Sequence, residues 1–188
     1  MEENKMEQKE NGEKNWKREV FGWVKTIAFT AAAYFVITST LIANAQVPTG
    51  SMENTIMPGS RIIINRLAYL TQEPQRGDVI SFWYPDNPKE NYLKRIIALP
   101  GETVEGKDGI IYINGKELEE SYIKEVSYMD FGPYTVPEES YFVMGDNRNN
   151  SWDSRYWTSK FVTRDAIVGK AEFEYYPQWK WLGRDIDY

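Results

Sequence analysis

The sequence predicts an all-β domain, mainly antiparallel, preceded by one N-terminal transmembrane helix. Two observations predict this fold class. Residues 26–52 carry no charged side chain, which is typical of a membrane segment. After them, short runs rich in β-branched and aromatic residues alternate with Gly, Pro, Asn and Asp, the pattern of strands joined by turns. At 188 residues and 41% apolar content, the chain can form one anchored domain with its own core.

The N-terminal segments differ sharply in polarity. Residues 1–25 hold six Lys or Arg and six Glu, with almost no apolar side chain before Trp16, which indicates a disordered tail. The apolar part of the next segment, about 27–45, would span about 28 Å as a helix, close to the thickness of a bilayer core. We therefore expect a transmembrane anchor over residues 26–45. Basic residues flank its N-terminal side, so the tail is predicted to be cytoplasmic and residues 46–188 extracytoplasmic.

A cleavable secretory signal is the alternative interpretation of the apolar segment. Ala43-Asn44-Ala45 has the small-x-small form of a processing site. However, the apolar core of a signal peptide usually has about 7 to 15 residues, fewer than this segment provides. The length therefore favours an anchor.

The remaining chain contains six runs with strand character. They lie near residues 61–65, 78–84, 92–99, 110–113, 141–144 and 166–176. Asn114-Gly115 follows the fourth run and predicts a tight hairpin, because a type I′ turn needs positive φ at both central residues. Residues from about 101 to 139 are more charged and are predicted to form a smaller β-rich insertion in a barrel or sheet core.

Composition excludes several kinds of active site. The chain has no His and no Cys, which excludes a Ser-His-Asp triad, a cysteine nucleophile, Cys/His zinc sites and disulfides. We expect no metal and no cofactor. A nucleophilic serine would need a lysine, a carboxylate or a terminal amine as its base. The net charge of −6 argues against a nucleic-acid partner.

Ser51 is the candidate nucleophile. It lies in the loop Thr49-Gly50-Ser51-Met52, six positions after Ala45. Even a fully extended chain of about 3.5 Å per residue keeps its hydroxyl within about 20 Å of the end of the predicted span. We therefore expect Ser51 to act on a substrate that the membrane holds nearby.

Lys94 is the candidate base. It stands beside Arg95 in an apolar run, and neighbouring residues of a strand point to opposite faces, so one of the two cations faces inward. Burial among apolar groups lowers the pKa of a lysine amine and so makes it available as a base. The alternative is a pair of solvated cations at a strand edge.

Residues 145–157 form the densest polar stretch. Carboxylates and arginines at this density can form bidentate pairs that fix a loop, while a plain solvated turn is the alternative. Four segments occur in order along the chain: Thr49-Gly50-Ser51-Met52, Arg76-Gly77-Asp78-Val79-Ile80, Lys94 to Glu102, and Gly145 to Trp157. Together they resemble the ordered motifs of bacterial type I signal peptidases.

The resemblance implies a role for each matching residue. Ser51 would be the nucleophile and Lys94 the general base, with Thr49 and the Ser51 amide forming the oxyanion hole. Ser151 would hydrogen-bond the lysine amine. The supporting charged residues would be Asp146, Arg148, Asp153 and Arg155, and the substrate-binding residues Met52, Asp78, Val79 and Ile80. Asn54 and Thr158 depart from the family, where proline and glycine are common.

The resemblance also implies a function. It is that of a membrane-anchored serine endopeptidase that removes signal peptides from exported preproteins, cutting after small-x-small sequences. Membrane lipid would be a second partner, and Trp179 and Trp181 are expected either at the headgroups or packed on the β core. Two alternatives remain: another Ser/Lys processing or self-cleaving peptidase, and a catalytically silent anchored β domain that binds exported chains.

Overall fold

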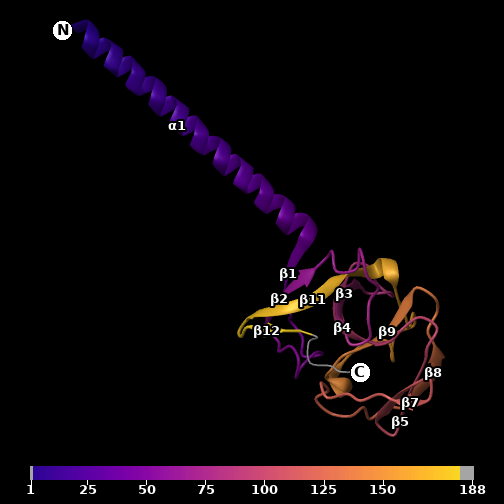
Figure 1. The fold of residues 1–188 in the computed structure, drawn as a ribbon. Helices are drawn as coiled ribbons and strands as arrows, with labels where there is room; N and C mark the ends of the chain where they lie inside the picture. Colours follow the sequence, from indigo (N-terminus) through magenta and orange to yellow (C-terminus); the bar gives the residue numbers. More distant parts are fainter. Residues whose placement is uncertain (1, 183–188) are drawn as a thin grey trace. The chain divides into compact units, whose positions relative to one another are not determined.

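Figure 1 shows the computed structural model, which describes residues 2–182. The chain divides into two units, residues 1–41 and 42–188. In the first, helix α1 (Glu2–Val36) continues into a π-helical turn, η1 (Ile37–Leu41). The helix includes residues 2–25, where we expected a disordered tail. Glu and Lys dominate that stretch and are good helix formers, which explains the difference.

The predicted anchor also ends earlier than expected. The helical part stops at Leu41, and residues 42–46 form strand β1 (Ile42–Gln46) instead of a last helical turn. β1 pairs along its whole length with β2 (Arg61–Asn65). Hydrogen bonding to β2 therefore decides the conformation of residues 42–46, although they continue the apolar run. Across residues 2–182, no helical segment combines the length and apolarity that a membrane span requires.

The second unit is built on two antiparallel sheets, which confirms the mainly antiparallel β class. The larger has the order β1-β2-β11-β3-β4-β9-β10, with β12 paired to β11. Its further strands are β3 (Val79–Trp83), β4 (Asn91–Ala98), β9 (Ser140–Met144), β10 (Val162–Thr163), β11 (Ile167–Tyr176) and β12 (Lys180–Trp181). Short 3₁₀ turns, η2 (Arg148–Asn150) and η3 (Arg164–Ala166), complete it.

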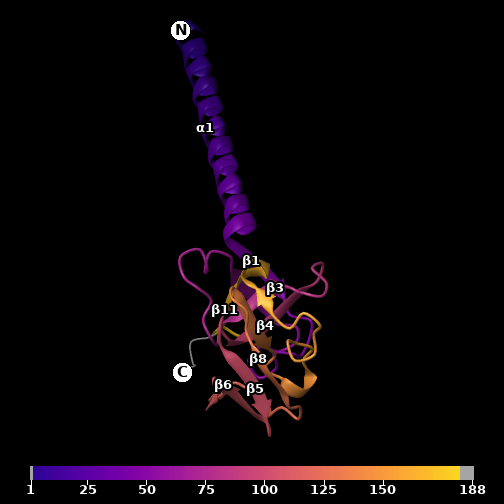
Figure 2. The same ribbon diagram turned by 90° about the vertical axis from the view of Figure 1, so that its right-hand side faces the viewer.

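The smaller sheet has the order β7-β6-β5-β8 and lies inside the predicted insertion, 101–139. Its strands are β5 (Thr103–Lys107), β6 (Ile110–Ile113), β7 (Lys116–Glu117) and β8 (Phe131–Thr135). Both ribbon views place this sheet at the end of the β unit opposite β1 (Figures 1 and 2). The predicted strands recur as β2, β3, β4, β6, β9 and β11 with ends shifted by at most one residue.

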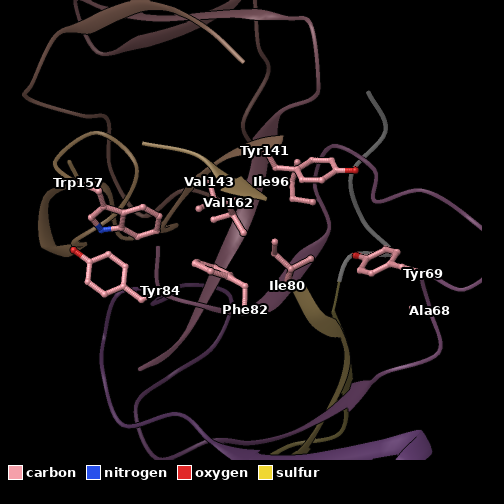
Figure 3. Close-up of a cluster of buried hydrophobic side chains, with 10 residues drawn as sticks. All are labelled: Ala68, Tyr69, Ile80, Phe82, Tyr84, Ile96, Tyr141, Val143, Trp157 and Val162. Carbon is pink, nitrogen blue, oxygen red and sulfur yellow. The ribbon is translucent and has the colours of Figure 1, made fainter. Parts of the chain in front are cut away.

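The core holds β4 rigidly. Ile80, Phe82, Ile96 and Val143, from β3, β4 and β9, pack with aromatic side chains that include Trp157 (Figure 3). Because β4 is hydrogen-bonded to β3 on one side and β9 on the other, residues 94–98 are all buried. Any polar side chain in this part of β4 must therefore find its partner inside the protein.

Candidate active site

The loop between β1 and β2 presents Ser51. Its turn is closed by backbone hydrogen bonds from Glu53 to Gly50 O, at 3.1 Å, and from Ile56 to Met52 O, at 2.8 Å. Met52 and Ile56 are fully buried and fasten the loop to the core formed with β2. Ser51 is thus held on a short, well-anchored turn, 9% exposed.

β4 delivers Lys94 to the same place. Its Nζ lies 2.8 Å from Ser51 Oγ and 3.0 Å from Leu93 O, and the residue is only 4% exposed. The two candidate catalytic groups, 43 positions apart in the sequence, are therefore in direct hydrogen-bond contact. The alternative of solvated cations at a strand edge is excluded for Lys94.

The surroundings favour an uncharged amine. Burial lowers the pKa of Lys94 to about 8, partly opposed by the negative charges of Asp153 and Asp146. From the ordinary value near 10.4, about 0.04% of lysine is neutral at pH 7, whereas a pKa of 8 leaves roughly a tenth neutral. The amine can therefore accept a proton from Ser51 near neutral pH.

Two groups near Ser51 Oγ are candidate donors to an oxyanion. Thr49 Oγ1 lies 3.5 Å from Ser51 Oγ, and both residues line one cleft of about 780 Å³. The Ser51 amide donates no hydrogen bond to any residue in the part of the chain described. Both groups are thus available to a bound carbonyl oxygen.

Three buried arginine–carboxylate ion pairs lie close to the site. Arg95 makes a bidentate pair with Asp146, at 2.8 and 2.7 Å, and Arg155 makes one with Asp153, at 2.8 Å for both bonds. Arg148 pairs with Glu120, at 2.6 Å, and not with a carboxylate of its own loop. Arg95 and Glu120 were not among the predicted site residues, although strand alternation places Arg95 on the face opposite Lys94.

Ser151 is close to the site but lacks the implied contact. It lines the same cleft as Lys94 and is 8% exposed, yet its hydroxyl has no hydrogen-bond partner among the described residues. Gly145 leaves room for it, because a Cβ there would lie 2.2 Å from Ser151 Oγ and 2.4 Å from Ser51 O. The structure therefore brings Ser151 to the cleft without joining it to the amine.

Of the four predicted substrate-binding residues, only Met52 lines the cleft. Asp78 instead accepts a hydrogen bond from the Tyr69 hydroxyl, at 2.9 Å, and pairs with Lys170. Val79 and Ile80 are fully buried, in separate clusters on the two faces of β3. Asp78, Val79 and Ile80 do not line the cleft, because β3 lies between β11 and β4, where core packing covers these positions. Their role in substrate binding stays a prediction.

The cleft offers aliphatic and aromatic walls. β1 and β2 contribute aliphatic side chains, including Ala45, Ile62 and Ile64, while Tyr92 and Trp152 contribute aromatic ones. No group of three or more His, Cys, Asp or Glu side chains that could hold a metal occurs in the described part of the chain.

Comparison with known proteins identifies the family of this chain. The family described as "Signal peptidase, peptidase S26" matches residues 20–176. A probable signal peptidase I-2 from Synechocystis sp. is 39% identical over 154 residues, 79% of this chain and 70% of that protein. A signal peptidase I from Bacillus amyloliquefaciens is 38% identical over 184 residues, 91% of this chain and 94% of that protein.

A solved structure is also similar in sequence. The crystal structure of a signal peptidase I from Enterococcus faecalis is 41% identical, covering 53% of this chain and 97% of that chain with a TM-score of 0.47. The family match spans most of the chain, including both Ser51 and Lys94. The chain therefore belongs to the signal peptidase family, peptidase S26.

Proposed function

We propose that this protein is a membrane-bound serine endopeptidase that removes signal peptides from preproteins. The observation that carries the proposal is the 2.8 Å contact between Ser51 Oγ and the buried amine of Lys94, with the pKa of that amine lowered to about 8. The relatives named above are signal peptidases, which supplies the substrate class.

The geometry supports the following reaction. Neutral Lys94 accepts the Ser51 proton as the hydroxyl oxygen attacks the peptide carbonyl, and the developing oxyanion is stabilised by Thr49 and the Ser51 amide. The protonated amine then gives its proton to the leaving amine, and an ester joins Ser51 to the signal peptide. Lys94 next deprotonates a water molecule, which hydrolyses that ester and regenerates the serine.

The buried ion pairs support the base without touching it. Asp146 and Asp153 each have a bidentate arginine partner, so their negative charges are largely compensated beside the amine. An uncompensated carboxylate there would favour the charged ammonium and raise the pKa of Lys94. Arg95 and Arg155 thus help to keep the base neutral.

We also propose that residues 26–41 attach the enzyme to a membrane, with the N-terminus cytoplasmic. Large apolar side chains of this segment, such as Phe29 and Phe35, are exposed in the structure, which favours an apolar environment around them. The hydroxyls of Thr26 and Thr40 donate to backbone carbonyls of the same helical segment, Gly22 O and Val36 O. Polar groups surrounded by lipid need such internal partners, because no water is present there. Protease protection of residues 1–25 in right-side-out vesicles, with residues 42–188 digested, is the expected result. Digestion of residues 1–25 in such vesicles would contradict this orientation.

A second membrane contact is proposed at the end of the β unit. Trp179 and Trp181 are 82% and 52% exposed, and each contacts the Phe173 ring in an edge-on or tilted arrangement, so most of their surface lies outside the core. The fragment 42–188, which keeps β1, should bind anionic liposomes more tightly than its Trp179→Ala, Trp181→Ala variant. Equal liposome binding by the fragment and its variant would contradict the proposed membrane contact.

The test of the proposed function uses a precursor whose signal peptide ends in Ala-x-Ala. Wild type should cleave it after the second alanine, and Ser51→Ala and Lys94→Ala should each lose cleavage while keeping a cooperative thermal unfolding transition. Cleavage by both variants would contradict the Ser/Lys mechanism. Binding without cleavage by wild type would favour the silent binding domain.

A further inference from the structure

The peptide bond between Gly50 and Ser51 carries the proposed oxyanion donor. A trans peptide is planar, so its C=O and N–H point in opposite directions. Any group that holds Gly50 O therefore also sets the direction of the Ser51 N–H. Within residues 50–53, Gly50 O accepts one hydrogen bond, from the Glu53 amide at 3.1 Å, which leaves its second lone pair for a donor outside the turn.

Asn147 holds the peptide groups on both sides of Ser51. Its Nδ2 donates to Gly50 O at 2.9 Å, and its backbone N–H donates to Ser51 O at 3.1 Å. The side chain is 3% exposed, so water does not compete for these bonds. One residue thus fixes the peptide planes before and after the nucleophile.

Glu53 fixes the orientation of that amide. The Asn147 Nδ2 group also donates to Glu53 Oε2, at 3.3 Å, so both of its hydrogens face acceptors and its NH₂ end must point toward the loop. Glu53 is in turn paired with Lys124 of the insertion, at 2.6 Å, while the Lys124 amide donates to Asp146 O at 3.2 Å. Lys124 of the insertion therefore holds Glu53 in place, and Glu53 in turn orients the Asn147 side chain.

We propose that Asn147 is a positioning residue that aims the Ser51 amide at the oxyanion. The inference rests on the proposed function and extends it, because it assigns the orientation of the oxyanion hole to a residue outside the cleft. Asn147 does not touch the substrate. Its side chain acts entirely through the Gly50–Ser51 peptide.

Asn147→Asp tests the proposal with the smallest change of shape. It replaces the NH₂ donor by an oxygen that would face Gly50 O and the Glu53 carboxylate, so the peptide loses its support. Because loss of a whole oxyanion donor costs about 10²- to 10³-fold, we expect kcat to fall by roughly 10- to 100-fold with KM changed by less than about 2-fold. A peptide boronic acid, whose tetrahedral adduct with Ser51 mimics the intermediate, should bind more weakly by a similar factor.

Asn65→Asp is the matched control. Asn65 also donates through Nδ2 to a glutamate, Glu172, at 3.1 Å, but lies in β2 outside the cleft. It should keep kcat and boronate binding near wild type. If Asn147→Asp fails to fold by circular dichroism, Asn147→Ser, which also removes Nδ2 but adds no charge, becomes the deciding variant and should show the same losses.

The outcomes separate the two ideas. Unchanged kcat and boronate affinity in the folded Asn147 variant would overturn the inference, as would equal losses in Asn65→Asp. Failure of wild type to cleave the precursor would instead refute the proposed function, and boronate capture by Ser51 would still decide the role of Asn147.

Discussion

Lys94 and Arg95 are adjacent in β4, yet their cationic groups have opposite environments. The Lys94 amine contacts the Ser51 hydroxyl at 2.8 Å, whereas the Arg95 guanidinium forms a bidentate pair with Asp146 on the other face of the strand. Only the arginine has a carboxylate partner, so only the lysine is desolvated without charge compensation by direct contact. Strand alternation therefore places Arg95, which has a structural role, and Lys94, the proposed base, on opposite faces of β4.

The lowered pKa of Lys94 predicts a stability effect. The charged amine is disfavoured in the fold, so its cost is fully present below pH 8, shrinks as pH rises, and vanishes above the unfolded value near 10.4. Lys94→Met removes the charge and should be more stable than wild type by about 3 kcal/mol at pH 7, with the gap closing toward pH 10. Denaturant unfolding at several pH values measures this. A gap that stays constant with pH would mean that the amine is not desolvated.

Thr49 is predicted to act in the transition state. Thr49→Val keeps the shape of the side chain but removes the hydroxyl, and kcat should fall by roughly 10² to 10³ without unfolding. Thr49→Ser retains the donor and should keep most of the activity. Precursor cleavage kinetics compare the two variants. Equal activity of Thr49→Val and wild type would remove Thr49 from the site.

Gly145 is predicted to tolerate no side chain. A Cβ at this position would stand 2.2 Å from Ser151 Oγ and 2.4 Å from the carbonyl oxygen of Ser51, so either the nucleophile loop or Ser151 must move. Gly145→Ala should therefore lower kcat at least about 10-fold and destabilise by about 1–3 kcal/mol. At Gly22 an added Cβ meets nothing within 4 Å, so Gly22→Ala is the control and should retain cleavage. Normal turnover by Gly145→Ala would show that this packing is unimportant.

The Arg95–Asp146 pair is predicted to need arginine. Lysine cannot form two parallel bonds to a carboxylate, and both side chains are only 1% exposed. Arg95→Lys should cost about 2–4 kcal/mol in thermal or denaturant unfolding, since breaking a buried pair is expensive. Arg76→Lys is the comparison, because the Arg76–Glu102 pair is more exposed and should cost less than about 1 kcal/mol. Similar losses of unfolding free energy in Arg95→Lys and Arg76→Lys would contradict the claim that the buried pair specifically needs arginine.

Several parts of this structure were predictable from local patterns. Strands with strong β-branched content, such as 61–65 and 110–113, were predicted with their observed ends. β1 was missed because Ile42 to Gln46 continues an uncharged run and becomes a strand only through pairing with β2. β5 and β8 were missed because glycine, proline and charged residues weaken their pattern, and partners within the insertion compensate.

Some site residues were likewise predictable from local sequence, and others were not. Ser51 and Lys94 carry recognisable chemistry in recognisable sequences, and the structure brings them together. Long-range partners left no local signal, as with Glu120 for Arg148, or Asn147 for the peptide at Gly50. Position within the sheet decided the remaining cases, because the central location of β3 buries Val79 and Ile80.

The central claim is that burial lowers the pKa of the Lys94 amine enough for a usable fraction of it to be neutral near physiological pH. Its most direct measurement is the titration of lysine ¹³Cε chemical shifts in the Ser51→Ala enzyme, with Lys94→Ala used to assign the signal. We predict a midpoint near pH 8, well below the ordinary value of about 10.4. A midpoint above pH 10 would contradict the account, because the proposed base would then be an ammonium ion that cannot accept the serine proton.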